Sequence, residues 1–415
     1  MRLLNVVSAL ACVATTVATI WENGQTRLNP YPAVGQAALI PSIPANSLSW
    51  RTYPANSPEI GYKGRWCSRY ISWWAAPGLK FRYTGSNVAI SFGEYTSDKV
   101  LLAWRISGLP WNFSNVTANS TYQFVSSSTP GIASGQTIFE FRVTNWALGV
   151  QIKAVHVAAG QAIYSVPLYP RKIEMIGDSL TVGYTSTYEA ISGIGWSLCE
   201  GLGNVEYSLV AYTGICLTDK ECYGSPRGQS FQWMQASDSG KRALQVYGSN
   251  PAPWNFSAHQ PADLVIINLG TNDINYKQGT TAVPEADFQR NYINLINSVR
   301  SKYPNAQVIA VQFWNGYYRS GNTYVQNPNR YKNAIPNAVN NFRAADGSNF
   351  VHYFDTTGIL QFSDINPKGH PTDIGYIKVA AHLMEYIKLE LGWDMGNTGQ
   401  EVHSHTQYYN DETTY

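Results

Sequence analysis

A serine stands directly after a short, mostly apolar run and beside a glycine and an aspartate. The run is Ile173–Ile176, and Gly177, Asp178 and Ser179 follow it in that order. This run predicts a buried strand, and in a parallel α/β sheet ligands bind at the carboxyl ends of the strands. Gly177 permits a bent backbone, and Asp178 or Ser179 can cap a helix that follows. The spacing therefore favours a nucleophilic serine at a sheet edge, with plain helix capping as the alternative interpretation.

Another strand-like run ends in a residue that can assist a nucleophile. Leu264–Leu269 predicts a fully buried strand, and it is followed by a Gly-Thr-Asn-Asp segment that contains Asn272. Near the end of the chain, His370 lies in a Gly-His-Pro segment just before the last predicted helix. We expect these residues to meet at the same carboxyl edge.

A serine, a histidine and N–H donors are the groups that ester cleavage requires. The serine attacks the acyl carbon, a base takes its proton, and the donors stabilise the oxyanion that develops. An imidazole with a pKa of about 6.5 suits this proton exchange at neutral pH. His370 is preferred as the base because the other histidines are expected in the β-rich region, a strand, a helix, a segment before a strand, or the polar tail: His156, His352, His382, His259, His403 and His405.

Three segments together resemble the SGNH or GDSL hydrolase superfamily. They are Gly-Asp-Ser-Leu at 177–180, Gly-Thr-Asn-Asp at 270–273 and the late His370-Pro371, in this order. Gly214 stands where the superfamily has its remaining glycine block. The resemblance implies that Ser179 is the nucleophile and His370 the base. It also implies an oxyanion hole made by the main-chain amides of Ser179 and Gly214 and the side-chain amide of Asn272.

Further segments are similar to the two-domain carbohydrate esterase family 2, the acetyl xylan esterase-like group. They are Trp254-Asn255-Phe256 before the 264–269 strand, together with Tyr292–Ile296 and Arg300–Pro304. This resemblance covers about residues 60–393 and is weak in the amino-terminal third. It implies a jelly-roll domain in front of a flavodoxin-like SGNH domain.

The chain departs from the superfamily pattern at the third member of a catalytic triad. Many members carry an aspartate three residues before the histidine, but Pro367 occupies that place here, and Lys368 follows it. Two alternatives remain. Either Asp364 reaches back through the loop, or a backbone carbonyl holds the imidazole of His370 and the enzyme works with a Ser-His dyad, which we prefer.

Trp314 and two aspartates complete the candidate site. Trp314 follows the strand-like run Gln307–Phe313, so we expect it at the same sheet edge, either stacking on a sugar or packed in the interior. Asp178 and Asp273 are expected to orient turns and caps rather than to act in acid-base chemistry.

The chain divides into an all-β part and an α/β part. Over residues 59–165, short alternating runs separated by turns predict an antiparallel sandwich. Leu79–Tyr83 and Val88–Phe92, joined by a turn at 84–87, have the pattern of a hairpin. Over residues 166–394, strand-like runs at 173–176, 205–210, 264–269, 307–313 and 350–354 alternate with helical segments. This alternation predicts a parallel sheet covered on both faces, a three-layer α/β domain.

Apolar residues at helical spacing predict two helices. One face consists of Phe288, Tyr292, Leu295, Ile296 and Val299, and Pro304 lies beyond its end. The last helix is predicted to begin at Thr372 or Asp373 and to present a face made of Ile377, Ala380, Ala381, Met384, Ile387 and Leu391.

The two ends of the chain have compositions of their own. Residues 1–18 have the charge, apolar core and small-residue site of a secretory signal peptide, so we expect a secreted, extracellular protein. Residues 19–58 predict an extended leader or a linker, and residues 395–415 a disordered tail.

Cysteines and glycosylation motifs agree with secretion. Cys67, Cys199, Cys216 and Cys222 remain after the signal, which is compatible with two disulfides in any of three pairings. Glycosylation motifs occur at Asn112, Asn115, Asn119 and Asn255, and the first three crowd a segment at 112–121 that we expect to be an exposed loop.

The composition limits the kinds of partner that we expect the protein to bind. Charged residues make up only 13% of the chain against an average of about 25%, aromatic residues make up another 13%, and the net charge is +2. No basic block is present that would neutralise phosphates, so nucleic acid is not expected as a partner. A neutral ligand such as a sugar suits this composition, and so does an ordinary secreted surface. No second run is long enough to span a membrane, and the cysteine spacing does not suit a metal site.

The sequence thus predicts a secreted serine esterase that removes acetyl or other short acyl groups from plant cell-wall polysaccharide such as xylan or mannan. We expect no cofactor, no metal and a monomer. Two alternatives are a lipase or lysophospholipase on the same scaffold, and a carbohydrate-binding protein whose esterase site is vestigial.

Overall fold

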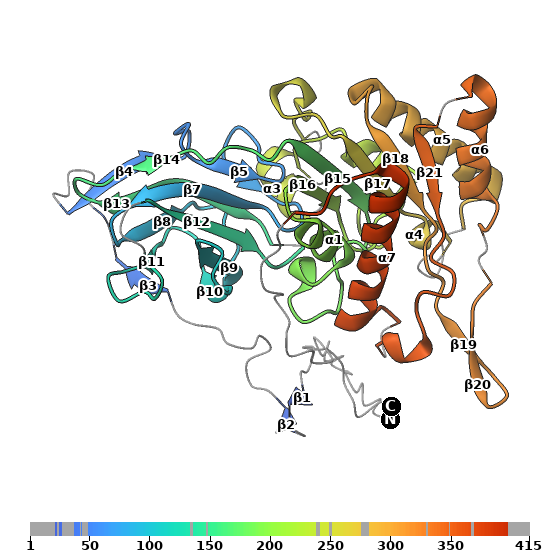
Figure 1. Ribbon diagram of the computed structural model, residues 1–415, viewed down its shortest axis with the longest axis horizontal. Coiled ribbons are helices and arrows are strands. Elements are labelled where there is room, and N and C mark those ends of the chain that lie inside the picture. Colours follow the sequence, from blue (N-terminus) through green and yellow to red (C-terminus); the bar gives the residue numbers. More distant parts are fainter. Residues whose placement is uncertain are drawn as a thin grey trace, which may run out of the picture.

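The computed structural model describes most of the chain between residues 49 and 396. The described residues are 21–22, 25–26, 37–41, 43, 49–132, 136–146, 148–237, 241–248, 251–274, 282–328, 331–347, 349–366 and 369–396. The predicted signal peptide at 1–18 lies outside these residues, as does almost all of the predicted tail. Figure 1 shows a β-rich half next to a half in which helices surround a sheet.

The α/β half contains one parallel five-stranded sheet with strand order β16-β15-β17-β18-β21. All neighbouring strands run parallel, and most of their residues are buried. The strands are β15 (Arg171–Gly177), β16 (Val205–Ala211), β17 (Leu264–Asn268), β18 (Gln307–Val311) and β21 (Val351–Phe354). All five strands come from short, mostly apolar runs that are buried on both faces of the sheet. The predicted flavodoxin-like sheet is therefore confirmed.

Helices cover both faces of this sheet and make three layers (Figure 1). One pair in contact is α1 (Ile194–Leu202) with α7 (Asp373–Leu391), and the other is α5 (Glu285–Lys302) with α6 (Ala334–Asp346). The shorter helices are η1 (Glu189–Ile191), α2 (Gln229–Gln232), α3 (Lys241–Tyr247), η2 (Phe256–Ala258), α4 (Thr271–Ile274) and η3 (Phe362–Asp364).

The predicted helix faces are correct for α5 and partly wrong for α7. In α5, all five predicted residues are buried. In α7, Thr372 is the N-cap as expected, but the buried face consists of Tyr376, Val379, Ala380, Leu383 and Ile387. Ala381 is exposed. The helix is apolar around much of its circumference, so spacing alone did not fix which side meets the sheet.

The β-rich half is an antiparallel sandwich. One sheet has the order β10-β9-β12-β7-β14, with β5 also paired to β7, and the other has the order β3-β11-β8-β13-β4, with β6 paired to β13. The strands are β3 (Ala38–Ile40), β4 (Trp50–Pro54), β5 (Gly61–Lys63), β6 (Ile71–Ser72), β7 (Gly78–Thr84), β8 (Val88–Phe92), β9 (Val100–Ile106), β10 (Asn112–Val116), β11 (Thr121–Val125), β12 (Gln136–Val143), β13 (Val150–Ala158) and β14 (Ile163–Tyr164). Four strands lie inside the segment predicted as a leader or linker. Two of them, β3 and β4, belong to the sandwich, and the other two, β1 (Trp21–Glu22) and β2 (Gln25–Thr26), pair with each other.

The predicted hairpin between β7 and β8 is wrong. The two strands belong to different sheets, β7 pairing with β5, β12 and β14, and β8 with β11 and β13. Phe81 of β7 and Ile90 of β8 both point into the core between the sheets. An alternating pattern places one side of each strand in a core whether the strands pair or face each other, so it did not distinguish the two arrangements.

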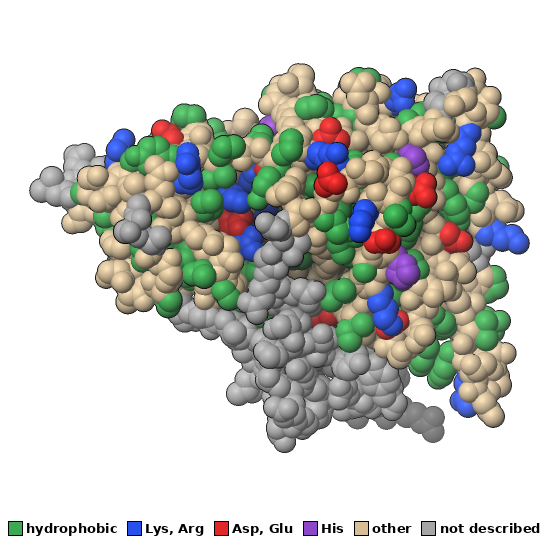
Figure 2. Space-filling model, viewed as in Figure 1, with side chains coloured by type: hydrophobic (Ala, Val, Ile, Leu, Met, Phe, Trp, Pro, Cys, Tyr) green, Lys and Arg blue, Asp and Glu red, His purple; other side chains and the backbone are tan. Residues whose placement is uncertain are grey.

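The sandwich packs directly on the parallel sheet. Its residues Trp74, Leu101 and Phe113 belong to the same buried cluster as the strands of the α/β half. Phe113 stacks on Tyr188, with ring centroids 4.1 Å apart. Figure 2 shows acidic and basic side chains gathered where the two halves meet.

Two buried ion pairs cross this junction. Lys63 Nζ lies 2.6 Å from the Glu206 carboxylate, and Arg65 lies 2.9 Å from Glu174. Burial lowers the pKa of Lys63, while Glu206 opposes that shift. Removing one partner of such a pair would leave an uncompensated buried charge, so the pairs tie the two halves together.

Of the two disulfides expected, one is present. Cys216 is bonded to Cys222, whereas Cys67 and Cys199 are free and buried. Cys67 Sγ lies 2.8 Å from the Tyr247 hydroxyl. Cys199 lies in the large core cluster on α1, and Cys67 in a separate small cluster, so these two sulfurs are not neighbours.

The segment with three glycosylation motifs is not a loop throughout. Asn112–Val116 forms β10 and pairs with β9, and its Phe113, Ser114 and Val116 are buried. Asn112, Asn115, Asn119 and Asn255 are nevertheless all exposed. Glycosylation at these positions stays a prediction.

Candidate active site

Ser179 stands in the turn that leaves β15 at the carboxyl edge of the sheet. A Cβ on Gly177 would come within 1.9 Å of the Thr181 hydroxyl oxygen, so only glycine permits this turn. The Thr181 N–H donates to the Asp178 carbonyl at 3.1 Å, and the Tyr184 N–H donates to the Ser179 carbonyl at 3.1 Å. No helix follows directly, contrary to the capping interpretation, because turns continue through the described residues until η1 and α1.

Asp178 supports this turn from the interior. It is fully buried, and its carboxylate accepts hydrogen bonds from the Leu180 N–H at 3.0 Å and the Asn272 side chain at 3.5 Å. Burial, together with the nearby Asp273, raises the pKa of Asp178 to about 7. Asp178 therefore links the turn that carries Ser179 to Asn272 without facing the cavity.

The loop before α7 brings His370 to the serine. The distance between His370 Nε2 and Ser179 Oγ is 3.0 Å, which is hydrogen-bonding distance. Asn366 organises this loop, because its N–H donates to the His370 carbonyl at 2.8 Å and its side-chain oxygen accepts the His370 N–H at 3.4 Å. The Tyr184 ring packs edge-on against the imidazole, with ring centroids 4.9 Å apart.

Three N–H donors lie near the serine. The main-chain N–H groups of Ser179 and Gly214 have no hydrogen-bond partner among the residues that the structure describes. Gly214 has φ +82°, and a Cβ there would also crowd Tyr223 at 2.8 Å, so this position requires glycine. Asn272, at the start of α4, donates side-chain hydrogen bonds to the Ile215 carbonyl at 2.8 Å and, at the longer distance of 3.5 Å, to the Asp178 carboxylate. Ser179, Gly214 and Asn272 all line one cavity with His370.

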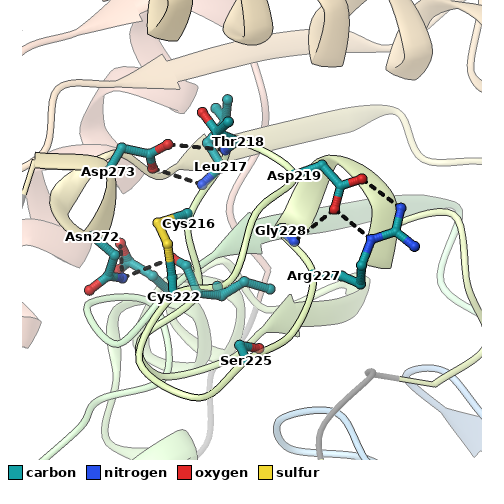
Figure 3. Close-up of a disulfide and its surroundings, with 12 residues drawn as sticks. Cys216, Leu217, Thr218, Asp219, Cys222, Ser225, Arg227, Gly228, Asn272 and Asp273 are labelled. Carbon is teal, nitrogen blue, oxygen red and sulfur yellow. Dashed lines mark hydrogen bonds and ion pairs between the residues drawn. A yellow bond between two sulfur atoms is a disulfide. The ribbon is translucent and has the colours of Figure 1, made fainter. Parts of the chain in front are cut away.

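Asp273 holds the loop that carries Gly214 (Figure 3). Its carboxylate accepts hydrogen bonds from the N–H groups of Leu217 at 2.8 Å and Thr218 at 3.0 Å. Burial raises the pKa of Asp273, while these bonds oppose the shift. The Cys216–Cys222 disulfide closes the same loop two residues beyond Gly214. Asp273 thus orients a loop, as the sequence indicated.

Aromatic side chains wall the cavity, which has a volume of about 610 Å³. They are Trp146, Tyr184, Tyr212, Tyr223 and Trp314. Leu180 is the only aliphatic side chain among the described lining residues. The wall is therefore both apolar and rich in hydroxyl and indole groups, which is a surface suited to a small polar ligand.

Trp146 comes from the sandwich, from the loop between β12 and β13. Its ring lies edge-on to Tyr212 and Tyr184, with centroids 5.1 and 6.2 Å away. Glu189 of the α/β half fixes this loop by accepting hydrogen bonds from the Asn145 side chain and the Trp146 main chain. Burial raises the pKa of Glu189 to about 7. The β-rich half thus contributes directly to the site.

Asp364, considered as a third triad member, does not reach His370. Its carboxylate accepts hydrogen bonds from Lys378 Nζ at 2.7 and 2.8 Å and from the Gln361 N–H at 2.8 Å. Within the described ranges, no hydrogen bond or ion pair joins Asp364 to His370. The reason is local, because Asp364 ends η3 and its side chain caps that short helix.

Sequence reasoning missed Trp146, Tyr184 and Asn366. No sequence signal pointed to Trp146, because it lies in the other domain, far from every site motif. Asn366 was within reach, since an Asn-Pro-Lys-Gly-His turn suggests an asparagine that bonds to its own loop. Trp314 does line the cavity and is almost fully buried.

The described part of the chain contains neither a metal-binding cluster nor a membrane-spanning helix. No group of three His, Cys, Asp or Glu side chains there is arranged to hold a metal ion. No helix within the described ranges has the length and apolar character needed to cross a bilayer.

Comparison with known families agrees with this architecture. Residues 175–377 match the model of the GDSL-like Lipase/Acylhydrolase family. The resemblance expected from the Ser179, Asn272 and His370 segments is thereby confirmed.

Two individual relatives are named as esterases. The chain is 26% identical over 367 residues to the cellulase/esterase CelE of Acetivibrio thermocellus, covering 83% of this chain and 41% of CelE. It is 23% identical over 266 residues to the acetylxylan esterase / glucomannan deacetylase of Cellvibrio japonicus, covering 61% of this chain and 66% of that protein. The chain therefore spans less than two thirds of the length of either relative.

A solved structure shares the complete two-part fold. It is a family two carbohydrate esterase from Clostridium thermocellum in complex with cellohexaose, with a TM-score of 0.61 and 22% identity. The match covers 80% of this chain and 99% of that one. It shows that the sandwich and the α/β domain occur together in other proteins of this fold.

Proposed function

We propose that this protein is a serine esterase that removes acetyl or other short acyl groups from plant cell-wall polysaccharide such as xylan or mannan. The observation that carries the proposal is the 3.0 Å distance between Ser179 Oγ and His370 Nε2, at a cavity rim where two main-chain N–H groups are unpaired within the described chain. The relatives are named as esterases and as an acetylxylan esterase / glucomannan deacetylase. Both lines support the same reaction class.

In the first half-reaction, His370 takes the proton of Ser179 as Oγ attacks the acyl carbon. The carbonyl oxygen becomes an oxyanion that accepts hydrogen bonds from the Ser179 and Gly214 N–H groups and from the Asn272 side chain. The intermediate then collapses as the bond from the acyl carbon to the sugar oxygen breaks, and the His370 imidazolium gives its proton to that oxygen, so the sugar leaves with a free hydroxyl. The acyl group remains bound to Ser179.

In the second half-reaction, His370 takes a proton from a water molecule that attacks the acyl-enzyme. A second oxyanion forms in the same hole, Ser179 leaves as its alkoxide, and the imidazolium returns a proton to it. The free carboxylic acid is released. Each half-reaction uses the imidazole first as a base and then as an acid.

The proposed catalytic unit is a dyad rather than a triad. A dyad base still needs its ring held in one orientation. Asn366 bonds to both the N–H and the carbonyl of His370, and the Tyr184 ring packs against the imidazole. Since the Asp364 carboxylate is paired with Lys378, we infer that main-chain and aromatic contacts do the positioning instead.

The cavity wall favours a sugar ester over a long-chain lipid. A lipase needs an apolar groove for the acyl chain, whereas this lining carries five aromatic side chains and a single aliphatic one among the described residues. Aromatic rings present faces to the C–H side of a sugar, and their polar edges can meet its hydroxyls.

We also propose that the protein is secreted. Residues 1–18 have the pattern of a signal peptide, and all four glycosylation motifs lie at exposed asparagines. The Cys216–Cys222 disulfide is of the kind that forms in an oxidising compartment. These three features support an extracellular setting.

Purified protein should be assayed on 4-nitrophenyl acetate, butyrate and longer esters and on acetylated xylan. Ser179→Ala should lose about 10⁴-fold or more in kcat. Asn272→Ala should lose about 10²- to 10³-fold, because one oxyanion donor is removed. Equal rates for the wild type and Ser179→Ala would end the enzyme proposal. Rates that increase with acyl length would instead favour a lipase.

A further inference from the structure

An exposed β-hairpin begins at the wall of the catalytic cavity. Its strands are β19 (Tyr317–Ser320) and β20 (Thr323–Gln326), which pair with each other and with no other strand of the described chain. The residues just before it, Trp314–Gly316, line the cavity. The hairpin projects from the α/β half at the lower right of Figure 1. Anything bound in the cavity with a long extension can therefore reach it.

A continuous row of aromatic rings leads from the cavity to this hairpin. The Trp314 and Tyr317 ring centroids are 5.9 Å apart, and those of Tyr317 and Phe362 are 6.0 Å apart. Tyr324 of β20 then stacks on Phe362, with centroids 3.6 Å apart and nearly parallel planes. The Tyr317 hydroxyl donates to the Leu360 carbonyl and so fixes the middle of the row.

Exposure increases along the row. Trp314 is 6% exposed, whereas Phe362 is 41% and Tyr324 is 46% exposed. Isolated two-stranded hairpins are marginally stable in water, so the Tyr324–Phe362 stack also anchors this one. Large aromatic side chains that stay in water beside an active site mark a binding surface.

Polar groups accompany the rings on the same face of the hairpin. The register places Arg319 opposite Tyr324 and Gln326 opposite Tyr317, and directly opposed residues share one face. Figure 2 shows hydrophobic side chains beside a basic one on this projection. Flat rings flanked by hydrogen-bond donors match the two sides of a sugar unit, its C–H face and its hydroxyls.

We propose that Tyr317, Phe362, Tyr324 and Arg319 form a distal glycan subsite. It binds the polysaccharide chain beyond the acylated unit that occupies the cavity. This inference rests on the proposed function, because it takes the substrate to be a polymer. The subsite contributes to binding of the chain and not to the bond-breaking steps at Ser179.

A second protein chain is a poorer occupant of this surface. Stable protein interfaces use roughly 20–30 residues a side. The hairpin strands together contain only eight residues, 317–320 and 323–326. A narrow row that starts in the cavity suits one extended polymer chain better than a broad partner surface.

The test compares Tyr324→Ala with Tyr318→Ala as a matched control. Tyr318 has the same 46% exposure but lies on the opposite face of the hairpin, opposite Val325. For acetylated xylan, Tyr324→Ala should raise KM about tenfold with kcat little changed. Its kinetics on 4-nitrophenyl acetate should equal those of the wild type. Tyr318→Ala should leave both substrates unaffected.

Direct binding separates failure of the subsite from failure of the esterase. Migration of Ser179→Ala through native gels that contain xylan should be retarded, and adding Tyr324→Ala should relieve most of the retardation. An unchanged KM on xylan, an equal effect of Tyr318→Ala, or a parallel loss on the small ester would overturn the subsite. A wild-type dimer that Tyr324→Ala dissociates would overturn it too. Absence of any ester hydrolysis by the wild type, with xylan retardation retained, would refute the esterase and leave the subsite standing.

Discussion

The ion pair of Asp364 allows a sharp test of the dyad. Asp364→Asn keeps an acceptor for the Gln361 N–H, which lies 2.8 Å from the carboxylate, but it removes the pair with Lys378. The Lys378 side chain is 39% exposed, so water screens this pair and its loss should cost about 1 kcal/mol of folding free energy. Because Asp364 is paired with Lys378 rather than with His370, kcat should fall by less than about tenfold, whereas loss of a triad aspartate costs ~10⁴-fold.

The measurements are kcat on 4-nitrophenyl acetate and the free energy of unfolding in urea. Lys378→Met is the matched control, because it removes the same ion pair from the other side. Both variants should be somewhat less stable and similarly active. A loss of 10³-fold or more in Asp364→Asn that Lys378→Met does not share would refute the dyad and restore Asp364 to the catalytic unit.

Two further predictions concern the supports of the site. The double variant Cys216→Ser, Cys222→Ser opens the loop that carries Gly214, so the free energy of unfolding should decrease by about 2 kcal/mol and kcat should fall. A reductant should lower both quantities in the wild type and neither in the double variant. Identical kcat in both proteins would show that the disulfide does not position Gly214. Asp178 has a folded pKa of about 7 against about 3.9 in an unfolded chain, so between those values the folded protein holds the extra proton and stability decreases as pH rises. Asp178→Asn should remove that decrease in the free energy of unfolding, which is on the order of 4 kcal/mol between pH 4 and 8. If the free energy of unfolding in urea changed with pH in parallel for the two proteins, Asp178 would not be the group responsible.

The parallel sheet and the convergence of the site were accessible from the sequence. Each strand of the sheet is a short apolar run, and burial on both faces requires such runs. Ser179, Gly214 and Asn272 each follow one of these strands, and the ends of parallel strands share an edge. Predicting the strands therefore also predicted that these residues meet.

The features of the fold and the site that the sequence did not predict depend on contacts between segments distant in sequence. Alternation in β7 and β8 was equally compatible with pairing and with facing sheets. The position of Trp146 is set by how the sandwich docks and by its hydrogen bond to Glu189, neither of which leaves a local pattern. The partner of Asp364 was also non-local, since Lys378 comes from the next helix. The pairing of the cysteines also could not be predicted, because it depends on the hydrophobic cluster in which each cysteine is buried.

The two halves share one hydrophobic core, so the protein cannot be divided between them without exposing that core. Cutting the chain near residue 166 would strip Trp74, Leu101 and Phe113 from the hydrophobic cluster and expose the surface they cover. It would also leave Glu206 and Glu174 without their cations. The α/β half is thus not a transplantable module. Engineering or gene fusion must carry the sandwich along as an integral part of the protein.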